Sequence, residues 1–134
     1  MANKISSQLS QAGYYLYIDG VSSRDLQLRV LSRENSNQTL TVAQGSRTEL
    51  ILPTVRKFIS KLGCVPAGLA VVNKGGSFTQ ARLVCVIANA LAYAWRVKVV
   101  AVPAGADRAL VDKLLKKTPA NNLVLPQYYG PGVN

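Results

Sequence analysis

The hydrophobic pattern of the chain changes its period near residue 45, and this change limits the folds that the chain can adopt. Before it, Tyr14–Ile18 is a run of aromatic and aliphatic residues that ends at a turn signal, Asp19-Gly20. Leu26–Leu31 and Gln38–Ala43 alternate between apolar and polar residues, which is typical of strands with one buried face. These three segments predict an antiparallel meander.

After residue 45 the pattern alternates between helix and strand. Ser46 and Glu49 have the spacing of a capping box at a helix start, and Gly63 is a natural residue after a helix end. The apolar periods predict a helix over 46–62, a buried strand at Leu69–Val72, a helix from Ser77 to Trp95, a strand at Val97–Val102 and a helix over Asp107–Lys117.

The resulting order, β-β-β-α-β-α-β-α, is that of the ribonuclease-H-like fold, which is also each half of the actin-like ATPases. We therefore predict an α/β fold with a five-stranded mixed sheet and helices on both faces. Residues 14–117 are expected to form a single lobe. An N-terminal extension (1–13) precedes it, and a tail (118–134) without any period follows it.

The charge balance predicts association with an acidic partner. Sixteen Lys and Arg stand against six Asp and Glu, which gives a net charge of +10. Such a charge favours contact with nucleic acid or with an acidic protein surface, although a solvated basic surface is the alternative. The start of the chain lacks the apolar core of a signal peptide, and polar residues interrupt the most apolar stretch, Leu83–Val102. We therefore expect a cytoplasmic protein with no membrane span.

The residues needed for catalysis are not gathered in any segment. The chain has no histidine, and its two cysteines lack the spacing of a zinc site, so we expect neither a metal nor another cofactor. A nuclease of this fold needs several carboxylates at strand ends to hold two metal ions. Here the first strand is followed by Asp19, but the fourth is followed by Asn73-Lys74, which supplies no carboxylate. A nuclease site is therefore not expected. The Gly75-Gly76-Ser77 turn has no Lys-Ser/Thr pair after it, so it is weak evidence for phosphate binding. We predict that the chain is not an enzyme.

Several segments resemble the TsaB family, which takes part in the synthesis of threonylcarbamoyladenosine in transfer RNA. The most specific is the turn Gly76, Ser77, Phe78 and Thr79 with Arg82 downstream; Ala88–Tyr93, Val97–Val102, Ser46–Pro53, Tyr15–Asp19 and Pro126–Tyr129 are also similar. Lys74 and Gly75 replace a Gly-Pro of the family pattern, Gln80 and Val84 replace glycines, and Gly20 replaces a threonine. The second lobe of the family is missing, so the resemblance is to a shortened, divergent form.

The resemblance implies a non-catalytic scaffold. TsaB proteins pair with the catalytic subunit TsaD through the two helices of their first lobe, and they self-associate through the same surface. The expected partners are therefore a TsaD-like subunit and, in isolation, a second copy. The residues expected at that interface are Leu52, Arg56, Ile59, Arg82, Cys85, Val86, Asn89 and Tyr93. For Arg82, bonding to the carbonyls of the preceding turn is an equally good interpretation.

The sequence also supports that interface without the resemblance. The helix from Ser77 to Trp95 is apolar nearly all round and has a stripe of small residues, Ala81, Cys85, Ala88 and Ala92. Such a helix would leave apolar surface exposed on a single lobe, and exposed apolar surface usually marks a partner site. Internal packing of the stripe is the more common explanation.

Direct binding of nucleic acid is the alternative function. It rests on basic residues outside the expected interface, namely Arg29, Arg33, Lys113, Lys116 and Lys117. Contact with transfer RNA could then come through the assembled complex or from the chain alone. Binding of this kind should weaken steeply with salt, because cations on the protein release counterions from phosphates.

Overall fold

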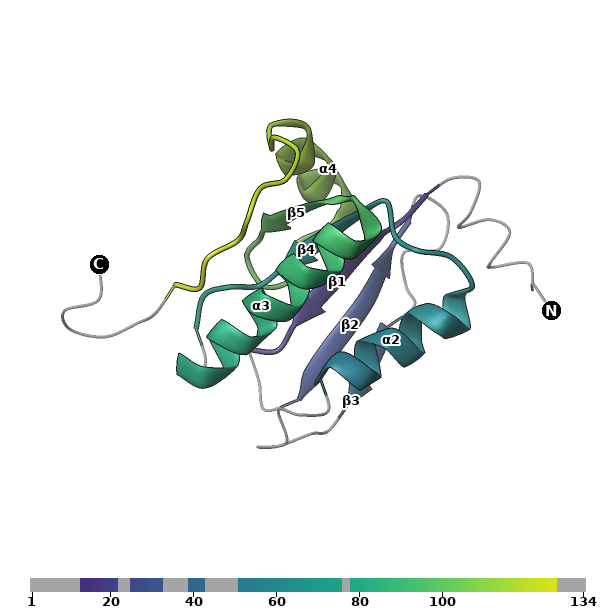
Figure 1. The fold of residues 1–134 in the computed structure, drawn as a ribbon, viewed down its shortest axis with the longest axis vertical. Helices are drawn as coiled ribbons and strands as arrows, with labels where there is room; N and C mark the ends of the chain where they lie inside the picture. The colour runs from purple at the N-terminus through teal and green to yellow at the C-terminus, as the bar shows by residue number, and fades with distance from the viewer. Residues whose placement is uncertain (1–12, 22–24, 33–38, 43–50, 76–77, 128–134) are drawn as a thin grey trace.

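A computed structural model describes residues 13–21, 25–32, 39–42, 51–75 and 78–127 (Figure 1). In chain order the elements are β1 (Tyr15–Asp19), β2 (Leu26–Leu31), β3 (Thr39–Val42), α2 (Ile51–Leu62), β4 (Gly68–Val71), α3 (Phe78–Trp95), β5 (Lys98–Ala101) and α4 (Arg108–Lys116). This is the predicted order of strands and helices. The helix that was predicted from Ser77 is described from Phe78 onward, because Ser77 lies outside the described residues.

The five strands form one mixed sheet in the order β3-β2-β1-β4-β5. β1, β2 and β3 pair antiparallel as the predicted meander, whereas β4 runs parallel to both β1 and β5. At the centre of the sheet, Leu16 lies opposite Val30 on one side and Leu69 on the other. The sequence-based prediction of a mixed five-stranded sheet is therefore confirmed.

Helices cover both faces of this sheet, as predicted. α2 and α3 pack on one face, over alternate strand residues such as Leu16, Ile18 and Leu69. α4 packs on the opposite face, where Tyr17 and Ala70 point. Figure 1 shows α2 and α3 both in front of the sheet, with strands visible between them, and α4 behind the sheet. This arrangement puts the outer surfaces of α2 and α3 on one side of the molecule.

The ends of the helices have local causes. The residue after α2 is Gly63, which has a φ of 82° and donates its amide to the Ile59 carbonyl at 3.1 Å, as expected of a glycine at a helix end. Asp107 caps α4 by accepting the Leu110 amide at 2.9 Å. The predicted capping box of Ser46 and Glu49 lies outside the described residues. No helix among those described is both long enough and apolar enough to cross a membrane.

Candidate interaction surface

The outer side of α3 carries large apolar side chains in contact with solvent. Val86 is 62% exposed and Tyr93 is 85% exposed. The two residues are seven positions apart, which is close to two helical turns, so they lie on the same side of the helix. On α2, Leu52 is 39% exposed. Together with Arg56 and Arg82, which are also exposed, these residues form what we call the α2–α3 surface.

The structure places the other predicted interface residues elsewhere. Ile59 and Cys85 are buried in the core between the helices and the sheet. Val86 is exposed although it follows Cys85 directly, because one residue turns a helix by about 100° and this takes its side chain off the buried side. Ile59 and Cys85 therefore position the two helices and do not contribute area to a surface. Asn89 is half-buried and has a different role, described below.

The stripe of small residues on α3 faces inward. All four of its members are buried against the sheet: Ala81, Cys85, Ala88 and Ala92. Small side chains allow α3 to lie close to the strands. The stripe therefore serves internal packing, which is the more common explanation for such a stripe. Of the family turn, Gly76 and Ser77 lie outside the described residues, Phe78 starts α3, and Thr79 is exposed.

The described part of the C-terminal tail, which ends at residue 127, runs beside α3 and is held there by asparagine residues. The Asn89 side-chain amide donates to the Val124 carbonyl and accepts the Val124 amide, both at 2.9 Å. Asn73 donates from its side chain to the Leu125 carbonyl at 2.6 Å and accepts the Gln127 amide on its own carbonyl at 2.8 Å. These bonds use only the backbone of the tail, so they hold it in an extended conformation.

The same tail covers the edge of the sheet at β5. The Asn122 side chain accepts the Val99 amide at 3.4 Å and donates to the Val99 carbonyl. Val124 enters the core on the α3 side, whereas Leu123 and Leu125 are 69% and 72% exposed. The tail thus blunts an edge strand, which would otherwise be a template for pairing with another chain.

Replacing Asn89 by alanine should loosen the tail. The variant leaves the amide and the carbonyl of Val124 without their partner, and we expect unfolding to become easier by about 1–3 kcal/mol. Urea denaturation measures the loss, and hydrogen exchange at the Val124 amide shows whether it is local. The control is Ala90→Ser at the exposed neighbouring position, with an expected change within about 0.5 kcal/mol. Equal effects for the two variants would contradict the proposed clamp.

The predicted RNA-contacting residues gather on the other side of the sheet. Arg29 on β2 lies over the Tyr17 ring at 5.3 Å and lines a hollow with Arg108 and Asp112 of α4. The rest lie on α4 or just after it, at Lys113, Lys116 and Lys117, while Arg33 is outside the described residues. The structure therefore brings four of the five predicted residues to one face, which we call the α4 face.

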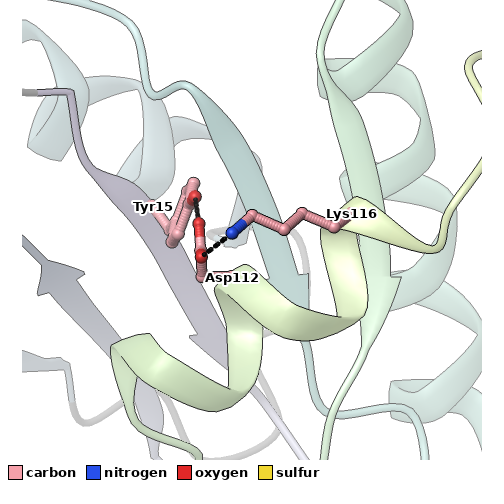
Figure 2. A network of polar contacts seen from close by, with 3 residues as sticks. All are labelled: Tyr15, Asp112 and Lys116. Atoms are coloured by element: carbon pink, nitrogen blue, oxygen red, sulfur yellow. Dashed lines mark hydrogen bonds and ion pairs between the residues drawn. The ribbon is translucent and has the colours of Figure 1, made fainter.

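Part of the charge on the α4 face is already compensated. Lys116 forms an ion pair with Asp112 at 3.1 Å, and Asp112 also accepts the Tyr15 hydroxyl at 2.5 Å (Figure 2). The hydrogen bonds from Tyr15 and then Lys116 lower the pKa of Asp112. Arg108, which the sequence analysis did not single out, stacks on the Tyr15 ring at 4.5 Å and donates to the Leu31 carbonyl at 2.8 Å. These contacts fasten α4 to the sheet.

Asp19, the residue that a metal-dependent enzyme of this topology would need, is used inside the fold. Its carboxylate is buried and accepts the Val21 amide at 3.0 Å and the Tyr17 hydroxyl at 3.3 Å. The Tyr17 hydroxyl in turn accepts the Gly105 amide at 2.9 Å. Within the described residues, no group of three potential metal ligands occurs. Asp19 therefore orders the turn after β1 and the loop after β5.

Solved structures with the same arrangement of elements give the fold a name. YeaZ from Pseudomonas aeruginosa, which is TsaB, matches with a TM-score of 0.54 and 23% identity, over 68% of this chain and 44% of YeaZ. The chain has the fold of part of YeaZ. A structure described as an uncharacterized protein with similarity to peptidase YEAZ from Pseudomonas aeruginosa matches with the same TM-score and identity, over 68% of this chain and 43% of its own length. The chain thus spans less than half of each.

The resemblance read from the sequence is confirmed by this likeness to YeaZ, at the level of the fold. No protein-family model matches the chain. A comparison with curated proteins also finds no relative. The likeness therefore rests on the three-dimensional arrangement and on the motifs that carry it.

Two departures from the TsaB pattern meet in space. A Cβ atom added to Gly20, where the family has threonine, would lie 2.6 Å from Cγ2 of Val84, where the family has glycine. The Val84 side chain on α3 therefore occupies the space that a side chain at position 20 would need. Val84 is buried, so it fills the space beside this turn.

Thiol labelling should separate the two cysteines. Burial raises the pKa of Cys85 to about 11, and it also raises the pKa of Cys64, which is only half-buried. Because the thiolate is the reactive form, we expect a disulfide reagent at pH 8 to label Cys64 slowly and Cys85 only after unfolding. A Cys64→Ser variant isolates the second thiol. Rapid labelling of Cys85 in that folded variant would contradict its place in the core.

Proposed function

We propose that this chain is a non-catalytic partner subunit that binds another protein through the α2–α3 surface. The observation that carries this proposal is the exposed apolar side of α3, with Val86 and Tyr93 two turns apart. A single exposed apolar residue is ordinary, but two large apolar side chains that are exposed on one side of a helix, with none of the described residues covering them, are typical of an interface. Leu52 is a further exposed apolar side chain on α2, the other helix on this face of the sheet.

The resemblance to TsaB supplies the partner. In this proposal the chain is a ribonuclease-H-like, actin-like lobe that acts in the cytoplasm with a TsaD-like catalytic subunit, in the synthesis of threonylcarbamoyladenosine in transfer RNA. Two helices from each subunit would then pack as a four-helix bundle. A second copy of this chain is the other occupant that the resemblance permits.

The absence of catalysis is part of the proposal. The chain has no histidine, so a serine or cysteine nucleophile would need another base. Cys85 is buried with a raised pKa, and the Asp19 carboxylate is occupied by backbone and hydroxyl donors. These features support a scaffold that positions another subunit.

Calorimetric titration of the chain into the TsaD-like subunit of the same source tests this function. We expect saturable binding with a stoichiometry of one to one and no hydrolysis by the chain alone. Micromolar concentrations suffice, because an interface of standard size commonly binds in or below this range. A titration without heat, together with separate elution of the two proteins, would reject the proposal.

Binding of transfer RNA through the α4 face is a second candidate. It is supported by Arg29, Lys113 and Lys117, which lie on this face away from α2 and α3. A variant with Lys113→Glu and Lys117→Glu should then weaken RNA binding and reduce its salt dependence. If the wild-type chain does not bind RNA even at low salt, this candidate is excluded.

A further inference from the structure

We infer that the partner of the α2–α3 surface is a protein with an acidic face, and that a second copy of this chain is not its occupant. This inference rests on the proposed function, because it assigns the chemistry of the partner at the same surface. It goes further in excluding one of the two occupants that the resemblance permits. The charges and the exposed side chains of α2 and α3 carry it.

Every charged residue on the two helices is a cation. α2 has three, Arg56, Lys57 and Lys61, and α3 has one, Arg82; neither helix contains an Asp or Glu. All four side chains are exposed. Asp107 and Asp112, by contrast, belong to α4 and its cap on the opposite face of the sheet. Over their described residues the two helices therefore carry four basic side chains and no acidic one.

This charge pattern opposes pairing between two copies. A twofold interface brings the same patch of each subunit together, so cations of α2 and α3 would meet cations of the other copy. Like charges brought together across an interface are strongly unfavourable, whereas a negative patch opposite them speeds and stabilises association. A surface of this composition selects a partner with carboxylates at matching positions.

The apolar residues favour a protein over a nucleic acid. Leu52 and Pro53 line a shallow hollow on α2 with Arg56 and Lys57. On α3, Val86 lies one turn after Arg82, so an exposed aliphatic side chain follows the cation along the same helix side. Aliphatic side chains lose water on contact with another apolar surface and gain little from phosphates. An apolar centre with charges around it is the usual anatomy of a protein interface.

A salt-dependent binding measurement with matched charge reversals tests this inference. The probe is the TsaD-like subunit of the same source, titrated with the full chain at about 50 and about 300 mM NaCl. We expect the wild-type affinity to fall about tenfold between the two salts. The variant R56E/K57E should bind at least about 30-fold more weakly at low salt. The control K113E/K117E carries the same charge change on the α4 side and should stay within about threefold.

The outcomes separate this inference from the proposed function. If a V86E/Y93E variant loses binding while R56E/K57E binds like the wild type, the acidic partner is rejected and the proposed interface stands. If no form of the chain binds the subunit, both fall. A wild-type dimer that is stable at 50 mM NaCl and dissociates in V86E/Y93E would also overturn the inference. The inference would also be overturned if the chain did not bind the subunit but bound transfer RNA through Arg56 and Lys57. Urea midpoints close to the wild type show that each variant is folded.

Discussion

A chain in which Val86 and Tyr93 are both glutamate should bind the TsaD-like subunit at least about 100-fold more weakly than the wild type. The two side chains are 62% and 85% exposed, so they are free to enter pockets of a partner. Losing two such anchors commonly costs several kcal/mol of binding free energy. The new carboxylates would also face an acidic partner. Calorimetric titration measures the change in dissociation constant.

The control for this experiment adds the same charge on the other side of the molecule. Ala104 and Ala109 are exposed, and Ala109 lies on α4. The variant A104E/A109E should bind within about threefold of the wild type, and both double variants should keep its unfolding free energy to within about 1 kcal/mol. Equal loss of affinity in both variants would point to charge alone and contradict a contact at Val86 and Tyr93.

Gly20→Ala should destabilise the fold by about 2–3 kcal/mol, because a Cβ there would lie 2.6 Å from Cγ2 of the buried Val84. Val84→Ala alone should cost about 1–2 kcal/mol through lost apolar burial. In the double variant the smaller side chain makes room for the new methyl group. We therefore expect it to be more stable than the sum of the single changes predicts, by about 1–3 kcal/mol. Urea denaturation of the four proteins measures this coupling.

Gly105 provides the matched glycine for this cycle. It has a φ of 82°, and a Cβ added to it would meet no atom within 4 Å. Gly105→Ala should therefore cost about 1 kcal/mol through backbone strain alone, with no coupling to Val84→Ala. If the free-energy changes of Gly20→Ala and Val84→Ala also add without coupling, as those of Gly105→Ala and Val84→Ala are expected to do, the short distance between the β1 turn and α3 is not the cause of the destabilisation.

The order of elements could be predicted because each element has its own hydrophobic period. The alternation in Leu26–Leu31 and the helical spacing from Ile51 to Leu62 report local geometry. The strand has the predicted bounds, and the helix ends at the predicted residue, whereas its predicted start at Ser46 lies outside the described residues. The same reasoning could not decide which side of α3 is covered. The helix is apolar on both sides, so Cys85 and Val86 look alike in the sequence although one is buried and the other exposed.

Contacts between distant residues could not be predicted from any period. The tail has no hydrophobic period in its sequence. It is held instead by side-chain hydrogen bonds of Asn89 and Asn122 to backbone groups 35 and 23 residues away. The bond from Tyr15 to Asp112 spans 97 residues (Figure 2). Lys57 and Lys61 could have been predicted from the sequence as exposed basic residues of this surface, since they lie on the polar side of the same helical pattern as Arg56.

The most direct test of the partner-subunit account is the mass in solution, measured by light scattering at about 150 mM salt. For the chain alone the account predicts a monomer of 14.4 kDa. In a mixture with the TsaD-like subunit of the same source, the measured mass should equal that of the subunit plus one copy of this chain. The V86E/Y93E variant should not form this complex. A chain that forms its own dimer and leaves the mass of the TsaD-like subunit unchanged would contradict the account.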